Sequence, residues 1–188
     1  MRLSEKFNEA LIFAGKLHAT QTRKASEIPY LAHLLGVTSI VLEYGGDEEE
    51  AMAALLHDAV EDQGGVATLE EIRRCFGERV AEIVAGCTDT TTTPKPPWRE
   101  RKEAYIAHIP TASASIRLVS CADKLYNSLS IVKDYRLVGE EVWKRFKGGK
   151  EGTLWYYRAL VEAFYKAETT ALVQELDRVV CELERLVS

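Results

Sequence analysis

The chain has 188 residues, of which 46% are hydrophobic and 28% charged, and its formal net charge is −5. These values are ordinary for a soluble globular protein, and the length predicts one domain over residues 1–188 with a sizeable core. The negative charge argues against general nucleic-acid binding. A small polyanionic ligand stays open, because the charge near a site decides what binds there.

Targeting signals and cysteine pairs are both missing from the sequence. No apolar run reaches the roughly 20 residues of a membrane-spanning helix, and the N-terminal residues do not resemble a signal peptide. Cys75, Cys87, Cys121 and Cys181 form no CxxC pair. We therefore expect buried, reduced thiols in a cytoplasmic protein without membrane contact.

Helical patterns fill the N-terminal half. Ser4 is a suitable N-cap for a first helix, and a second helix is predicted to begin at Pro29 and to end at Gly45-Gly46. Asp47 followed by Glu50 resembles a capping box, which predicts a third helix running into the segment around residues 57–62.

Glycines and polar residues then divide the next stretch. Gly64-Gly65 allows a sharp backbone turn. Thr68 with Glu71 resembles a second capping box, and Gly77 is expected to stop that helix. A short helix is predicted over residues 78–87.

The C-terminal half also has a helical pattern. The segment Thr88–Pro97 is predicted to be a loop, followed by a helix from Trp98 to His108. Pro110-Thr111 is predicted to open a long helix through Asn127. A second loop is expected at Lys147–Gly152, followed over Thr153–Val187 by one helix or by two that break near residues 169–170. The sequence thus predicts an all-α fold.

Metal-binding side chains gather around residues 57–62. His57 and Asp58 are followed four residues later by Glu61 and Asp62, and residues four apart on a helix share a face. His33 and Asp123 lie on other predicted helices. Ligands from three helices can surround one ion, and two imidazoles with two carboxylates suit manganese, iron or zinc.

These residues also form a known pattern. His33, the pair His57-Asp58 and Asp123 follow the order H…HD…D and so resemble the HD-domain metal phosphohydrolases. Arg23-Lys24, with Pro29-Tyr30 ahead of His33, is similar to the RK…PY..H opening of the hydrolase domain in RelA/SpoT proteins.

Further motifs follow in the same order. The stretch from Leu56 to Asp62 resembles that family's LHD..ED, Val84–Thr88 resembles its LV.GVT, and Ala122–Asn127 reads ADKLYN. The resemblance covers about Arg23 to Asn127. A chain of this length without a synthetase domain resembles the small alarmone hydrolases, which implies an HD-type helical bundle around a single metal site.

The resemblance also implies roles for the site residues. It makes Mn²⁺ the expected metal, although the residues alone leave other divalent transition metals open. Glu61 is then the expected general base and Asp62 its orienting partner. The implied metal ligands are His33, His57, Asp58 and Asp123.

Several polar residues are candidates for substrate contact. The resemblance places Arg23 and Lys24 at the nucleobase end of the pocket, while Asn127 can bond a ribose. Lys95 and Lys150 lie in predicted loops that can close on a phosphate. Ordinary solvated surface is the alternative for each cation. His18 and His108 carry no motif, and both are interpreted as structural.

The resemblance implies hydrolysis of the 3′-pyrophosphate of (p)ppGpp, the alarmone of the stringent response, to GDP or GTP and pyrophosphate. Two alternatives stay open. One is an HD-type phosphohydrolase acting on another nucleotide, such as a nucleoside monophosphate or NADPH. The other is a non-catalytic nucleotide sensor. The sequence does not determine whether the protein forms a homo-oligomer.

Overall fold

The computed structural model describes residues 2–24, 26–90, 92 and 94–188. Within these residues the regular structure is helical, apart from one isolated bridge between Thr22 and Pro29. The α-helices are α1 (Glu5–Leu17), α2 (Leu31–Glu43), α3 (Glu48–Leu56), α4 (Ala59–Asp62), α5 (Val66–Phe76), α6 (Glu78–Cys87), α7 (Trp98–His108), α8 (Ala114–Val138), α9 (Gly149–Ala167) and α10 (Ala171–Val187). Short 3-10 helices cover Ile109–Thr111 and Gly139–Arg145. The prediction of an all-α fold is confirmed.

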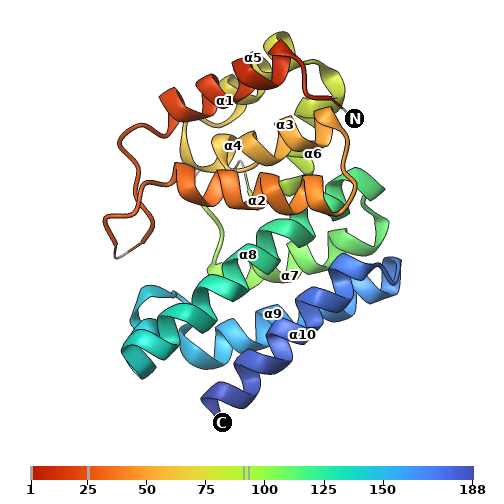
Figure 1. The fold of residues 1–188 in the computed structure, drawn as a ribbon. Coiled ribbons are helices and arrows are strands. Elements are labelled where there is room, and N and C mark those ends of the chain that lie inside the picture. The colour runs from red at the N-terminus through yellow and green to blue at the C-terminus, as the bar shows by residue number, and fades with distance from the viewer. Residues whose placement is uncertain (1, 25, 91, 93) are drawn as a thin grey trace.

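Two groups of helices meet along α8 (Figure 1). Helix α3 packs against α1, α2 and α6 in the N-terminal group, and α8 packs against α2 and α6 on one side and α10 on the other. One apolar cluster includes residues from α1 to α10. On this basis we propose that residues 1–188 form a single domain.

Helix α3 is the buried centre of the N-terminal group. The predicted capping box is present: the Asp47 side chain accepts a hydrogen bond from the Glu50 amide at 2.9 Å, and the Glu50 side chain accepts one from the Asp47 amide at 2.8 Å. Every residue from Ala51 to Leu56 is buried. Three of these are alanines, whose small side chains let neighbouring helices approach closely.

The predicted third helix breaks at the metal-binding pair. Helix α3 ends at Leu56, His57 and Asp58 form a turn, and α4 begins at Ala59. The prediction of one continuous helix through Asp62 was therefore wrong. The His57 ring nitrogen Nδ1 lies 2.8 Å from the Ala54 carbonyl oxygen, so the imidazole folds back along α3. The break turns both side chains of the pair toward α2 and α8.

The turns predicted at Gly64-Gly65 and Gly77 are confirmed, but the predicted second capping box is absent. Gly64 and Gly65 have φ of 131° and 64°, and Gly77 has φ of 102° where α5 ends. Such backbone angles favour glycine. Thr68, however, lies inside α5, and its hydroxyl donates to the Gln63 carbonyl oxygen at 2.8 Å. The Thr68–Glu71 capping box was wrong because α5 begins before Thr68.

In the C-terminal half two boundaries differ from prediction. The long helix α8 begins at Ala114 with Ser113 as N-cap, since Pro110 and Thr111 lie in a 3-10 helix. The loop predicted at Lys147–Gly152 was wrong from Gly149 onward, where α9 begins.

The remaining expectations for this half agree with the structure. The helices α9 and α10 are separated at residues 168–170, which confirms the two-helix alternative. Between residues 88 and 97 the described residues form no helix or strand, and Thr91 and Thr93 lie outside them.

The four cysteines are free, and Cys121 is fully buried while the others are partly buried. In the described part of the chain, none of the helices combines the length and the apolar character needed to cross a membrane.

Candidate metal centre

Four predicted ligands meet where α2, the α3–α4 turn and α8 come together. Nε2 of His33 lies 3.3 Å from Oδ2 of Asp58 and 3.3 Å from Oδ1 of Asp123. Nε2 of His57 lies 3.0 Å and 3.6 Å from the same two oxygens. The ligand atoms of His33, His57 and Asp58 all lie within 4.8 Å of one another. The fold therefore brings together residues up to ninety positions apart in the sequence.

The Nε2 atoms of the two buried imidazoles are suited to bind a metal ion. His33 and His57 are 1% and 2% exposed, and within the described residues neither Nε2 atom has a hydrogen-bond partner. The other nitrogen of His57 contacts the Ala54 carbonyl oxygen, an arrangement common in metal-binding histidines because it directs the Nε2 lone pair at the ion. A mixed set of two nitrogens and two carboxylate oxygens fits a divalent transition metal.

The pKa values of the two carboxyl groups in the centre are both lowered. Burial disfavours the charged form of Asp58, but the neighbouring His57 and His33 outweigh it and hold the pKa of this carboxyl well below its usual range. For Asp123, burial is likewise outweighed by Lys124 and the two histidines, and its pKa also lies well below the usual range. Both carboxylates are therefore ionised at neutral pH, as metal ligands must be.

A second set of side chains holds the two carboxylates. The Tyr30 hydroxyl donates to Oδ2 of Asp58 at 2.6 Å, and burial together with the Asp58 charge raises the pKa of Tyr30, which keeps its proton in place. The Asn127 amide donates to Oδ1 of Asp123 at 2.5 Å, and Lys124 pairs with Oδ2 at 2.5 Å. Each carboxylate is thereby oriented, as is usual around metal ligands.

The acidic pair predicted to act on water lies on α4, directly after Asp58. Oε1 of Glu61 accepts a hydrogen bond from Nζ of Lys95 at 2.9 Å. Oδ2 of Asp62 accepts one from Nε2 of Gln21 at 2.7 Å. Lys95 thus lies beside the acidic pair.

Arg23 and Asn127 are hydrogen-bonded to each other beside the centre. Nη2 of Arg23 donates to Oδ1 of Asn127 at 2.9 Å, and its guanidinium carbon lies 5.9 Å from the centroid of the Tyr126 ring. Lys24 is exposed in the same turn. Among the candidate substrate-binding residues, Arg23, Asn127 and Lys95 therefore lie close to the centre. Lys24 is next to Arg23 in the sequence.

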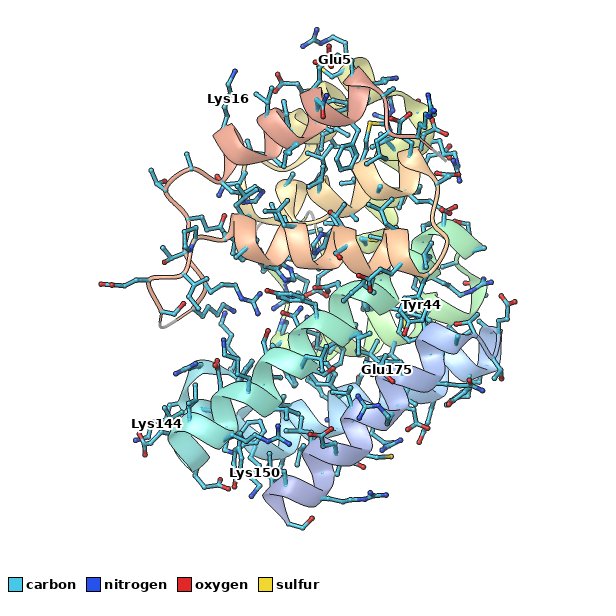
Figure 2. All side chains as sticks on the ribbon, in the orientation of Figure 1. Glu5, Lys16, Tyr44, Lys144, Lys150 and Glu175 are labelled. Carbon is cyan, nitrogen blue, oxygen red and sulfur yellow. The ribbon has the colours of Figure 1, made fainter. Side chains whose placement is uncertain are left out.

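Lys150 is the exception. Its ammonium group pairs with Glu140 at 2.9 Å and donates to the Val187 carbonyl oxygen at 2.8 Å. Figure 2 shows it near Lys144, at the end of the molecule where α10 finishes. Its place in the first turn of α9 and the pairing of its charge argue against the expectation that Lys150 closes on a phosphate.

Sequence reasoning missed several residues around the centre. His18 was interpreted as structural and Gln21 was not considered, although both belong to the hydrogen-bond network that reaches Asp62. Tyr30 and Lys124 were noted only as motif letters. Their signal was position, since all four lie within or just before the matching motifs, but which atoms they contact depends on the tertiary fold.

Comparison with known proteins identifies the family. A model of the HD domain matches residues 10–154. This chain belongs to the HD-domain family. The H…HD…D pattern of His33, His57, Asp58 and Asp123 lies within the matched segment.

Relatives within this HD-domain group carry specific names. The chain is 43% identical over 138 residues to the guanosine-3′,5′-bis(diphosphate) 3′-pyrophosphohydrolase MESH1 of Xenopus tropicalis, covering 72% of each protein. It is 38% identical to the Homo sapiens protein of the same name, over 74% of each chain. A solved structure of a metazoan ortholog of SpoT that hydrolyses ppGpp aligns with a TM-score of 0.80 at 27% identity, covering 97% of this chain and 98% of that one.

Proposed function

We propose that this protein is a metal-dependent hydrolase that removes the 3′-pyrophosphate of ppGpp and pppGpp, giving GDP or GTP and pyrophosphate. The observation that carries the proposal is the approach of the buried Nε2 atoms of His33 and His57 to two ionised carboxylates, with neither Nε2 atom hydrogen-bonded within the part of the chain that the structure describes. The substrate in this proposal comes from the relatives named as 3′-pyrophosphohydrolases, which align with 72% and 74% of this chain.

The proposed ligands are His33, His57, Asp58 and Asp123, and the proposed ion is Mn²⁺. A divalent ion held there supplies Lewis acidity toward a phosphoryl oxygen and lowers the pKa of bound water. Tyr30 and Asn127 keep the two carboxylate ligands in place through their hydrogen bonds. Harder oxygen ligands and imidazoles together are compatible with manganese.

The chemical step requires a water molecule, a base and a leaving group. For pyrophosphate to leave intact, water attacks the phosphorus nearest the ribose, the bond from that phosphorus to O3′ breaks, and O3′ takes up a proton. Glu61 accepts the proton of the attacking water in this proposal, and Asp62 orients it. Lys95, 2.9 Å from Glu61, offsets negative charge as the phosphoryl group is transferred.

The nucleotide is held at its other end by Arg23. A guanidinium plane can stack on a purine, and Arg23 already lies over the Tyr126 ring and beside Asn127. Lys24, exposed in the same turn, supplies a further positive charge. Asn127 contacts both Arg23 and Asp123, so it links the nucleotide end of the pocket to the metal centre.

The test is a substrate panel with the purified, manganese-loaded protein. Products from ppGpp, pppGpp, NADPH and a nucleoside monophosphate are separated by chromatography. The proposal predicts GDP and pyrophosphate from ppGpp at the highest kcat/KM of the panel. Preferred turnover of NADPH or of the monophosphate would replace the substrate assignment. Tight binding of ppGpp without turnover would indicate a nucleotide sensor.

We also propose that the protein works in the cytoplasm. Its four cysteines are free thiols, which a reducing compartment preserves, and a soluble nucleotide is the expected substrate. Fluorescence microscopy of the tagged full chain tests the location.

A further inference from the structure

The side-chain amide of Gln21 is fixed by hydrogen bonds at the edge of the metal centre. Its Nε2 donates to Oδ2 of Asp62 at 2.7 Å. Its Oε1 lies 2.6 Å from Nε2 of Gln63 and 2.7 Å from Nδ1 of His18. Because Gln63 donates to this oxygen and a carbonyl oxygen can only accept, Oε1 must face His18 and Gln63, and the amide nitrogen must face Asp62.

The backbone that carries Gln21 is also held. Its carbonyl oxygen accepts from the Tyr30 amide at 2.9 Å, and its own amide donates to the His18 carbonyl oxygen at 3.1 Å. The next residue, Thr22, forms the isolated bridge with Pro29. The turn after α1 is therefore held by backbone hydrogen bonds, which fix the direction in which the Gln21 side chain leaves the backbone.

His18 connects this network to the metal ligand Asp58. It is 3% exposed, and its ring stacks on Tyr30 with centroids 5.3 Å apart and planes inclined by 23°. The Tyr30 hydroxyl in turn donates to Asp58. With Gln21 as its acceptor, the His18 proton resides on Nδ1. One short segment, residues 18–30, thus holds both a predicted metal ligand and the predicted water-orienting carboxylate.

Asp62 needs such support more than the ligands do. It is the last residue of α4, which has four residues, and the chain then turns through Gly64 and Gly65. Asp62 is exposed, whereas the four ligands are buried or partly buried. A carboxylate at the exposed end of a short helix has several accessible rotamers, and each hydrogen bond to it restricts them.

We infer that Gln21, itself fixed by His18 and Gln63, is a positioning residue that sets the orientation of the Asp62 carboxylate, which in turn orients the attacking water. The inference rests on the proposed function. Gln21 acts through Asp62 and is not assigned any contact with the substrate or the metal. A hydrogen bond to a charged group has a size that corresponds to roughly ten- to hundredfold in rate when its loss is felt fully in the transition state.

Two substitutions test this role without emptying the site. Gln21→Met keeps the length of the side chain and removes all three hydrogen bonds. Gln21→Glu keeps the acceptor for His18 and Gln63 and replaces only the donor that faces Asp62. Both should lower kcat for ppGpp about ten- to hundredfold, with KM within about twofold and bound manganese unchanged. Thr20→Val, at an exposed position in the same turn, is the matched control and should keep wild-type kcat.

A double-substitution cycle separates positioning from general damage. In an Asp62→Ala background, Gln21→Met should cause no further loss of kcat, because the residue through which it acts is gone. Equal losses in the two backgrounds would overturn the inference. So would wild-type kcat in both Gln21 variants.

The structural arm does not depend on turnover. A crystal structure of the Gln21→Met protein should show the Asp62 carboxylate rotated from its wild-type direction, and an unmoved carboxylate would contradict the inference. Wild-type protein is assayed on ppGpp in parallel. If it shows no turnover, the proposed function fails, while the crystal structure still decides whether Gln21 orients Asp62.

Discussion

Arg23 and Asn127 are 104 positions apart in the chain, yet Nη2 of Arg23 donates to Oδ1 of Asn127 at 2.9 Å. Asn127 also donates to the predicted metal ligand Asp123. The turn that precedes α2 is therefore tied to the middle of α8 at the place where the nucleotide is proposed to bind.

Replacing Arg23 tests this end of the pocket. Arg23→Met should raise KM for ppGpp by about tenfold or more with a smaller change in kcat, because the lost contact holds the ground state and the transition state alike. Steady-state kinetics measure both constants. Arg74→Met, at a well-exposed position on α5, is the control and should match the wild type. A loss confined to kcat would place Arg23 in the chemical step.

The two lysines that sequence analysis treated alike should now behave differently. Lys95→Met removes the cation 2.9 Å from Glu61 and should lower kcat/KM for ppGpp roughly tenfold. Lys150→Met should leave kcat/KM unchanged and cost about 1 to 2 kcal/mol of stability, because it removes a partly exposed ion pair and one hydrogen bond to the Val187 carbonyl oxygen. Equal kinetic effects would contradict the placement of both lysines.

Metal content distinguishes the ligands from the residues that act on water. Asp58→Ala should lose manganese and activity together, since Oδ2 of Asp58 lies 3.3 Å from Nε2 of His33 and 3.0 Å from Nε2 of His57. Glu61→Ala should keep manganese and lose most of its turnover, about a hundredfold or more for a general base. Elemental analysis of the purified variants measures the metal. If Glu61→Ala lost its metal as readily as Asp58→Ala, Glu61 would have to be counted among the ligands.

The capping box of α3 gives a prediction for stability and its pH dependence. Asp47→Ala should lower the free energy of unfolding by about 1 kcal/mol at neutral pH. Burial raises the pKa of Asp47, but the Glu50 amide and Arg79 outweigh it, so the pKa lies below its ordinary value of 3.8. The stabilisation by the charged form is complete above pH 3.8 and is lost as the pH falls through the lowered pKa.

Urea unfolding of Asp47→Ala at several pH values measures this effect. Asp47→Asn is the control, because it keeps an oxygen acceptor for the cap and removes only the charge. The gap between wild type and Asp47→Asn should shrink on acidification below pH 3.8. A gap that widens there would show that the ionised carboxylate is not the stabilising form.

Local chemistry in the sequence accounts for much of this fold. The Asp47–Glu50 box and the stop at Gly77 depend on residues within a few positions of one another, and both were predicted. The break before α10 was one of two alternatives that the sequence left open. The break between Leu56 and Ala59 was not, because the segment has helical spacing and its turn places His57 and Asp58 against α2 and α8.

The start of α9 was missed for a related reason. The glycines around residue 149 indicate a loop locally, yet a Cβ atom at Gly148 would lie 2.6 Å from the Trp98 ring, and one at Gly152 would lie 3.2 Å from it. Glycine is used there to admit an indole from α7. This tertiary contact cannot be predicted from the local sequence. The ion pair between Lys150 and Glu140 could not be predicted for the same reason.

In the candidate site, too, some residues could be predicted from the sequence pattern and others only from the tertiary fold. The four proposed ligands and the acidic pair were predicted because their order along the chain matches a family pattern, and the fold brings the proposed ligands together. The supporting residues Gln21, Tyr30 and Lys124 were not assigned roles, since a hydrogen bond to Asp62, Asp58 or Asp123 requires knowing which elements pack side by side.

The most direct test of the account is turnover of ppGpp by the manganese-loaded protein in water labelled with a heavy oxygen isotope. We expect GDP without label and pyrophosphate carrying one labelled oxygen, because water attacks the phosphorus nearest the ribose and O3′ stays with the nucleotide. Label in the nucleotide product, or release of single phosphate groups in place of pyrophosphate, would contradict the proposed reaction.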